Sequence, residues 1–243
     1  MYSFPPIAAA IGAAFTVVMT LTDTLSPVLG GAAAAVAVVG LTVAVRLVLL
    51  PLSVAQVRGE KARTRLLPKL RELQREHGKN RERLLREQRR LYAAEGVSPL
   101  AGCLPALAQI PVFVTLYGLF VSATIADAPN ALLTHTLGGV PLGATLTESL
   151  ASGVGVEALV FGALLAVIAA TAWLSRRFLM LPALAANSGE GGPAVPGFRL
   201  VTLLPFGTVV VASFVPLAAG VYLATTTAWT VAERLALRQL IAG

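Results

Sequence analysis

The sequence predicts an all-α integral membrane protein that forms a single polytopic domain over residues 1–243. Apolar residues make up 56% of the 243 residues, and the mean hydropathy is +0.77. Charged residues make up only 13%, whereas a soluble domain has about a quarter. Apolar runs also alternate with basic clusters, as they do in chains that cross the bilayer several times.

The N-terminal stretch, Tyr2 to Thr22, is uncharged and barely long enough to span a bilayer. We expect a helix that lies along the outer interface, with a sixth spanning helix as the alternative. The stretch lacks the basic region of a secretory signal peptide and the Arg-rich pattern of an organellar transit peptide. A bacterial plasma membrane, crossed several times, is therefore the expected location.

Five firm transmembrane helices are expected after this stretch. They cover Gly31–Val57, Pro99–Thr124, Ala158–Leu174, Leu200–Phe214 and Pro216–Ala232. The last two are short and divided at Val215-Pro216, so we expect a tight helical pair that ends at Glu233-Arg234. Residues 181–197 are rich in Gly and Pro, which predicts a flexible cytoplasmic loop.

Residues 58–98, between the first and second spans, are expected to form a cytoplasmic helical hairpin. Leucines recur there at three- and four-residue steps on both sides of a turn at His77–Asn80. Pro68 is expected to bend or interrupt the first helix. The hairpin carries 13 basic and six acidic residues. This charge fits a solvated helix pair that only fixes orientation, attraction to anionic lipid, or binding to ribosomal RNA or a translocation partner.

The basic residues also predict the topology. Outside the hairpin they cluster at Arg176, Arg177 and Arg199, and at Arg234 and Arg238. Residues 1–45 and 91–175 contain no Lys or Arg. Basic segments are retained in the cytoplasm. We therefore expect the hairpin, the second basic loop and the C-terminus in the cytoplasm, with residues 125–155 outside.

Arg46 is the candidate functional residue because it interrupts the first span. A charged side chain at the centre of a spanning helix costs about 2.5–3.5 kcal/mol on insertion scales. Either it is a structural arginine bonded to neighbouring helices, or it faces a water-filled cavity, which is the interpretation we favour. Polar residues at comparable depths would line the same site: Thr42, Gln109, Thr208, Tyr222, Thr225 and Thr226. Taken alone, each threonine more often bonds its own backbone.

The sequence offers no chemistry for an enzyme. Cys103 is the only cysteine, which excludes a disulfide framework and a cysteine-based metal site. His77 and His135 are too isolated for a metal site or a catalytic pair. No phosphate-binding loop or nucleophile–base pairing is present, so we expect no enzymatic activity, no cofactor and no metal.

Residues 96–113, GVSPLAGCLPALAQIPVF, resemble the NPLGGCLPLLIQIPIF stretch of the YidC insertase family, which includes mitochondrial Oxa and chloroplast Alb relatives. Ser98 replaces the family's Asn. A second similarity is Val45-Arg46 followed by Leu50-Pro51-Leu52, where the family carries its membrane arginine. The order of span, charged hairpin, span and late helical pair agrees as well, so the resemblance covers residues 31–238.

The resemblance implies a membrane protein insertase and chaperone. It would guide hydrophobic segments of client proteins into the bilayer through a hydrophilic groove open to the cytoplasm and to lipid. Arg46 would be the groove arginine, with Thr42 and Gln109 lining the same cavity. In the last span Pro216, Tyr222, Thr225, Trp229 and Thr230 fit the family pattern, whereas Leu223, Thr226 and Thr227 depart from it.

The expected partners follow from this function. They are nascent membrane-protein clients, the ribosome, the Sec translocon and membrane lipids, with no specific nucleic acid sequence and no small-molecule substrate. Arg81, Arg83 and Arg86 of the hairpin are the expected partner-binding residues. Two other classes of protein stay open: a small transporter or channel that uses Arg46 and Gln109, and a membrane-tethered module that binds ribosomes or RNA.

Overall fold

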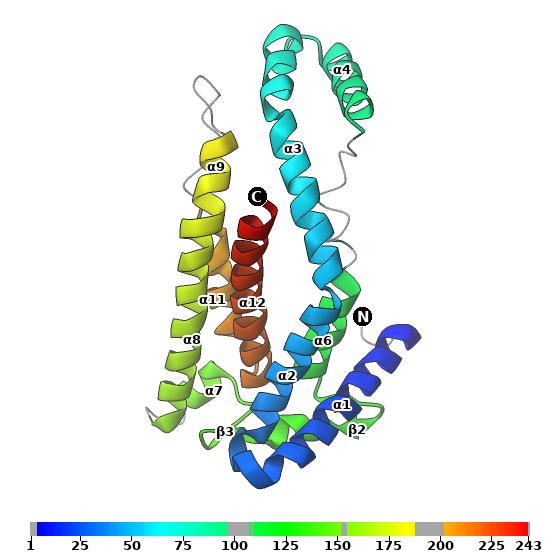
Figure 1. Ribbon diagram of the computed structural model, residues 1–243. Helices are drawn as coiled ribbons and strands as arrows, with labels where there is room; N and C mark the ends of the chain where they lie inside the picture. Colours follow the sequence, from blue (N-terminus) through cyan, green and yellow to red (C-terminus); the bar gives the residue numbers. More distant parts are fainter. Residues whose placement is uncertain (1–3, 97–106, 108, 152–154, 188–201, 243) are drawn as a thin grey trace. The chain divides into compact units, whose positions relative to one another are not determined.

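A computed structural model describes residues 4–96, 107, 109–151, 155–187 and 202–242. The chain divides into two compact units, residues 1–48 with 111–235, and residues 49–110 with 236–243. The described residues are helical except for short connections and two small strand pairs (Figure 1). This architecture agrees with the all-α membrane class that the sequence predicts.

Among the residues that the structure describes, two continuous helical stretches are long and apolar enough to cross a membrane. They are Pro5–Val48 and Val156–Leu184, and a shorter apolar helix, α6, covers Ile110–Val121. The length and composition of the first two therefore suit them to a bilayer about 30 Å thick.

The first stretch contains α1 (Pro5–Leu29) and α2 (Ala33–Val48), joined by the 3-10 turn η1 (Gly30–Ala32). Gly30 has a φ of 51°, a backbone region that glycine enters without steric cost, and α1 folds back to pack against α2 (Figure 1). Helix α1 extends to Leu29, beyond residues 2–22, the stretch in which the sequence predicts the N-terminal helix.

The second stretch contains α8 (Val156–Leu174), the π-helical turn η3 (Ser175–Met180) and α9 (Leu181–Asn187). The prediction of a flexible loop over 181–197 is wrong for residues 181–187, which are helical, and residues 188–197 lie outside the described residues. The backbone N–H of Leu181 donates to the Arg176 carbonyl, the wider π-type bond. Such a turn lets the helix continue into Pro182, which cannot donate a backbone hydrogen bond.

The late helical pair differs from its prediction at both ends. Over the described part of 200–214 the chain forms a 3-10 turn, η4 (Leu204–Phe206), and a short α11 (Gly207–Ala212), not one spanning helix. Pro205 and a run of β-branched residues make this segment a poor helix former. The following helix α12 covers Leu217–Ala242 and does not end at Glu233-Arg234. The Ala, Leu, Arg and Gln residues after Glu233-Arg234 have high helix propensity, so the charges of these two residues do not end α12.

The segment between α6 and α8 is folded, although the sequence predicted only an exterior loop. It contains the strand pair β1 (Thr124–Ile125) and β2 (Ala128–Pro129), and the pair β3 (Thr136–Leu137) and β4 (Val140–Pro141). Gly138 and Gly139, with φ of 61° and 86°, form the turn of the second pair. The segment ends in α7 (Leu146–Ala151).

Buried Asn130 holds this segment together. Its side-chain Nδ2 donates to the Leu119 and Ser122 carbonyls, each at 2.9 Å, and its Oδ1 accepts from Leu132 N at 3.2 Å. The start of α12 is tied to the same segment because Leu217 N donates to the Ala144 carbonyl at 2.9 Å. The segment between α6 and α8 therefore fixes the position of α12 within the first unit.

Helix α7 begins with a reciprocal cap. Thr145 N donates to Glu148 Oε2 at 3.0 Å, and Glu148 N donates to Thr145 Oγ1 at 3.4 Å, as in a capping box. The hydrogen bonds from the backbone and then the hydroxyl of Thr145 hold the pKa of Glu148 below its ordinary value. This pattern, T-x-x-E, is visible in the sequence.

The second unit contains α3 (Leu50–His77) and α4 (Arg81–Ala94), which pack against each other across a three-residue turn, Gly78–Asn80. Asn80 caps α4 because its Oδ1 accepts from Arg83 N at 3.0 Å. Lys69 of α3 forms an ion pair with Glu95 after α4. Of the two predicted effects of Pro68, a bend or an interruption, the interruption is wrong because α3 continues through Pro68. Pro68 is exposed, so water can bond the carbonyl group that proline leaves without a donor.

Candidate functional site

Arg46 forms the centre of the candidate site in the first unit. It is half-buried on α2, and its Nε donates to Thr226 Oγ1 of α12 at 3.0 Å. Its Nη2 donates to the same hydroxyl oxygen. Two helices that lie far apart in the sequence are thus joined by one guanidinium group, and the acceptor is a neutral hydroxyl.

Aromatic side chains form one wall of this site. Tyr222 lies one turn before Thr226 on α12 and is only 3% exposed. Its ring centroid lies 5.5 Å from that of Phe120 and 6.0 Å from that of Phe113, both on α6. The Tyr222 hydroxyl is close to the Thr226 side chain and within the electrostatic field of Arg46. Helices α2, α6 and α12 therefore all contribute to the site.

The other residues expected at the site have different surroundings. Thr42 is buried and donates to its own helix at the Val38 carbonyl, at 2.7 Å. Thr225 likewise donates to the Val221 carbonyl at 2.8 Å. Thr208 lies on α11, which packs against α8. Gln109 lies just before α6 and is assigned to the second unit. Of the expected set, the structure brings Thr226 and Tyr222 to Arg46.

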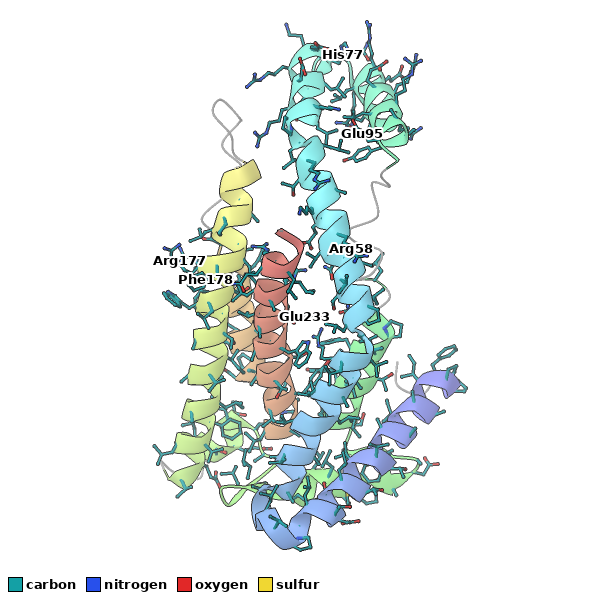
Figure 2. All side chains as sticks on the ribbon, viewed as in Figure 1. Arg58, His77, Glu95, Arg177, Phe178 and Glu233 are labelled. Atoms are coloured by element: carbon teal, nitrogen blue, oxygen red, sulfur yellow. The ribbon has the colours of Figure 1, made fainter. Side chains whose placement is uncertain are left out.

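The end of α8 provides a reference for depth. Its 19 residues correspond to about 28 Å, close to the thickness of a hydrocarbon core. At its end, Trp173 and Phe178 are 52% and 45% exposed, and the Arg177 guanidinium carbon lies 5.8 Å from the Phe178 ring centroid. Figure 2 shows Arg177 and Phe178, in η3 directly after α8, on the side of this helical stretch that faces away from α12. Exposed aromatic and basic residues of this kind mark a membrane interface.

Two contacts set the register of α12 against α8. Thr171 Oγ1 lies 3.4 Å from Thr227 Oγ1. A Cβ atom at Gly220 would lie only 2.6 Å from Leu164 Cδ2, so the absence of a side chain permits this close approach. Thr226, next to Thr227, thus lies about one to two turns, roughly 8 Å, from the basic end of α8. The Arg46 head group is bonded to Thr226 and therefore lies at a similar level along α8.

The charge of Arg46 is the second feature of the site. Among the described residues, no carboxylate forms an ion pair with it. A guanidinium group has five N–H donors, and two of its nitrogens are used on Thr226. The remaining donors can bind water or an acidic group, and the cationic charge acts over a longer range because the surroundings are apolar.

A second polar pair on α12 was not identified from the sequence. Trp229 Nε1 donates to Glu233 Oε2 at 3.0 Å. Thr230, the residue after Trp229, donates from its Oγ1 to the Thr226 carbonyl at 2.7 Å. The four-residue spacing of Trp229 and Glu233 was the available signal, because such residues share a helical face.

The described residues contain no group of three or more His, Cys, Asp or Glu side chains that could hold a metal ion. The chemistry available at the site is therefore that of a cation, hydroxyl groups and aromatic rings.

Comparison with known proteins gives a consistent family. The model of the 60Kd inner membrane protein family matches residues 24–242. The membrane protein insertase YidC of Cellvibrio japonicus is 42% identical over 94 residues, which are 38% of this chain and 17% of that protein. The YidC insertase of Magnetococcus marinus is 42% identical over 98 residues, 40% of this chain and 18% of its own length.

A third relative, the YidC insertase of Histophilus somni, is 42% identical over 87 residues, 36% of this chain and 16% of that protein. The matched segments are thus less than one fifth of each relative. The family match itself covers most of this chain, including both helices that carry Arg46 and Thr226. The chain therefore belongs to the 60Kd inner membrane protein family, the YidC family that residues 96–113 and the Arg46 region resemble.

Proposed function

We propose that this protein is a membrane protein insertase and chaperone that guides hydrophobic segments of client proteins into the bacterial inner membrane. The observation that supports this most directly is the Arg46 cation, which donates to the Thr226 hydroxyl between α2 and α12 and forms no ion pair with a carboxylate of the described residues. The insertase names of the relatives point in the same direction.

The mechanism that we propose is physical and needs no covalent step. A client's polar flank must cross hydrocarbon, where each unsatisfied polar group costs several kcal/mol. A polar groove around Arg46, open to the cytoplasm and to lipid, shortens that crossing. The guanidinium group attracts acidic residues of the translocating flank, while the client's apolar segment moves out into lipid. Burial of apolar surface then drives insertion.

The membrane topology is part of the proposal. Residues 58–98 and the basic residues 176–199 lie in the cytoplasm, together with the C-terminus, and residues 125–155 lie outside. The distribution of Lys and Arg supports this arrangement. Nascent chains, the ribosome, the Sec translocon and lipids are the proposed partners of the cytoplasmic and membrane surfaces.

We predict that a cysteine at Ala131 is labelled only from outside intact cells, whereas one at Lys79 is labelled only after the membrane is permeabilised. Both positions are exposed, and replacing Cys103 with serine removes the only native thiol. Asn130 is unsuitable as a reporter because it is 3% exposed and fixes the exterior segment. Labelling of Ala131→Cys from the cytoplasmic side alone would contradict the topology.

Photo-crosslinking tests the insertase function directly. A photoreactive residue at Thr225, which is half-buried beside Thr226, is expected to capture ribosome-bound nascent chains that carry a hydrophobic segment. The matched control is Val167 of α8, which is 51% exposed at a similar depth and would meet lipid instead. Strong capture at Thr225 with a hydrophobic client, and none with a hydrophilic chain of equal length, is the expected result. A solute flux without any nascent-chain capture would favour a transporter and contradict the proposal.

A further inference from the structure

Glu233 lies on α12, near residue 235 where the first unit ends, and one of its carboxylate oxygens has no hydrogen-bond donor among the described residues. Its Oε2 accepts from Trp229 Nε1 at 3.0 Å. Its Oε1 is buried and has no hydrogen-bond partner among the described residues. Figure 2 labels Glu233 on α12. Oε2 is therefore held by the Trp229 indole, whereas Oε1 has no donor among the described residues.

The buried Oε1 of Glu233 needs a donor from outside the described residues. A buried polar group that loses its partner costs about 1–3 kcal/mol, and more when the group is charged. Such atoms are rare in native proteins and indicate a water, an ion or a ligand. A carboxylate accepts hydrogen bonds only, so the missing group is a donor, and a cationic donor makes the strongest bond.

Glu233 and the Arg46 site lie on the same side of α12. Thr226, Trp229 or Thr230, and Glu233 follow one another at three- and four-residue steps, which places them on one helical face. Thr226 and Glu233 are separated by about two turns, roughly 10 Å along the axis. Since Thr226 is about 8 Å from the basic end of α8 by the register given above, Glu233 lies at the level of the interface. A cation inside the bilayer thus has an anion two turns closer to the cytoplasm.

Arg176 is the internal residue that competes for Glu233. It lies in η3 at a similar level, and its Nε is also buried without a hydrogen-bond partner among the described residues. The two groups do not form an ion pair in the structure. Arg234 and Arg238 already have interactions of their own. Glu233 Oε1 thus has no partner among the described residues, although Arg234 is its neighbour in the chain and Arg176 lies in η3.

We propose that Glu233, oriented by Trp229, binds a lysine or arginine in the cytoplasmic flank of the client. This inference rests on the proposed insertase function and deepens it. Arg46 attracts acidic residues of the translocated flank, and Glu233 holds the basic residues that stay behind. The ring of Trp229 covers the aliphatic stem of the client's side chain, while the free Oε1 accepts from its ammonium or guanidinium group. The face of α12 thereby orients the client before it leaves for lipid.

The test uses the full chain in proteoliposomes and two single-span clients that differ only in Lys or Gln at two positions of the cytoplasmic flank. E233Q keeps the acceptor for Trp229 but removes the charge. It is expected to reduce insertion of the Lys-flanked client about fivefold, the scale of a half-exposed ion pair, and to leave the Gln-flanked client unchanged. E233D should recover part of the loss, and W229F, which releases the carboxylate, should give a smaller loss of the same selectivity.

Several outcomes would overturn the inference. An equal loss for both clients, or no loss for either, would mean that Glu233 has a structural role or none. If R176Q and E233Q reduce insertion by the same factor for each client, Arg176 is an internal partner of Glu233. Thermal unfolding of each variant in detergent excludes misfolding. Failure of the wild-type chain to insert even the Gln-flanked client would overturn the insertase proposal itself, so the two failures are distinguishable.

Discussion

Arg46→Gln is expected to reduce insertion of a client whose translocated flank carries two acidic residues by about tenfold. A client with a neutral flank should insert nearly as well as it does with the wild type. Two unit charges about 4 Å apart attract by about 4 kcal/mol at an effective dielectric constant near 20, and water in the groove reduces this. The remaining 1.4 kcal/mol or so corresponds to the tenfold change. Insertion into proteoliposomes, followed by protease protection of the translocated flank, measures the effect.

Two control variants separate the charge of Arg46 from its structural bond. Arg46→Lys keeps the charge and is expected to retain most of the activity toward acidic flanks. Thr226→Val removes the hydroxyl that accepts from Nε and Nη2 but leaves the cation, so its loss should be smaller than that of Arg46→Gln. An equal loss for acidic and neutral flanks in Arg46→Gln would contradict the electrostatic role and favour a structural arginine.

The position of Arg46 could be predicted from the sequence, but its partner could not. A lone charge in an apolar run is visible without a structure. Thr225, Thr226 and Thr227 are consecutive, however, and adjacent residues of a helix point about 100° apart. The rotation of α12 decides which of them meets α2, and tertiary packing sets that rotation. Only Thr226 faces Arg46, whereas Thr227 contacts Thr171 of α8 and Thr225 bonds its own helix.

Helix ends were predicted less well than helix locations because membrane boundaries and helix boundaries have different causes. Charged residues mark the exit of α12 from the apolar region near Glu233, yet the helix continues to Ala242. The apolar run before α12 suggests a span, yet Pro205 and the β-branched residues limit α11 to Gly207–Ala212. Hydropathy reports where a segment prefers to be, and backbone propensity reports which conformation it adopts there.

The segment between α6 and α8 was the least predictable part of the first unit. Its strands are two residues long, so they contain no alternation of polar and apolar residues that a sequence pattern could reveal. What fixes this segment is a set of specific hydrogen bonds, above all those of Asn130. A single asparagine in a loop gives no sign of such a role.

Charge reversal on the hairpin is expected to have the other large effect. The triple variant Arg81→Glu, Arg83→Glu and Arg86→Glu should weaken ribosome association at low salt by at least about a hundredfold. All three arginines are exposed on α4. The logarithm of the affinity falls linearly with the logarithm of the salt concentration, and each phosphate contact that is lost makes this fall less steep by roughly 0.7–0.9. Co-sedimentation of proteoliposomes with ribosomes over a salt series measures both the affinity and this slope.

The position of Arg81 and Arg83 on α4 separates a loss of binding from a loss of folding. Arg81 and Arg83 lie in the first turn of α4, behind the Asn80 cap, where the positive end of the helix dipole disfavours a cation by about 0.3–1 kcal/mol. Replacing them with Glu should stabilise α4, so weaker binding cannot result from unfolding of the hairpin. Arg→Lys at all three positions keeps the charge and should keep most of the binding. Reversal of three exposed arginines of α3, Arg58, Arg63 and Arg65, changes the net charge by the same amount and controls for it. If the triple reversal binds ribosomes as the wild type does at low salt, this face of α4 is not the docking surface, and the hairpin's charge serves topology alone.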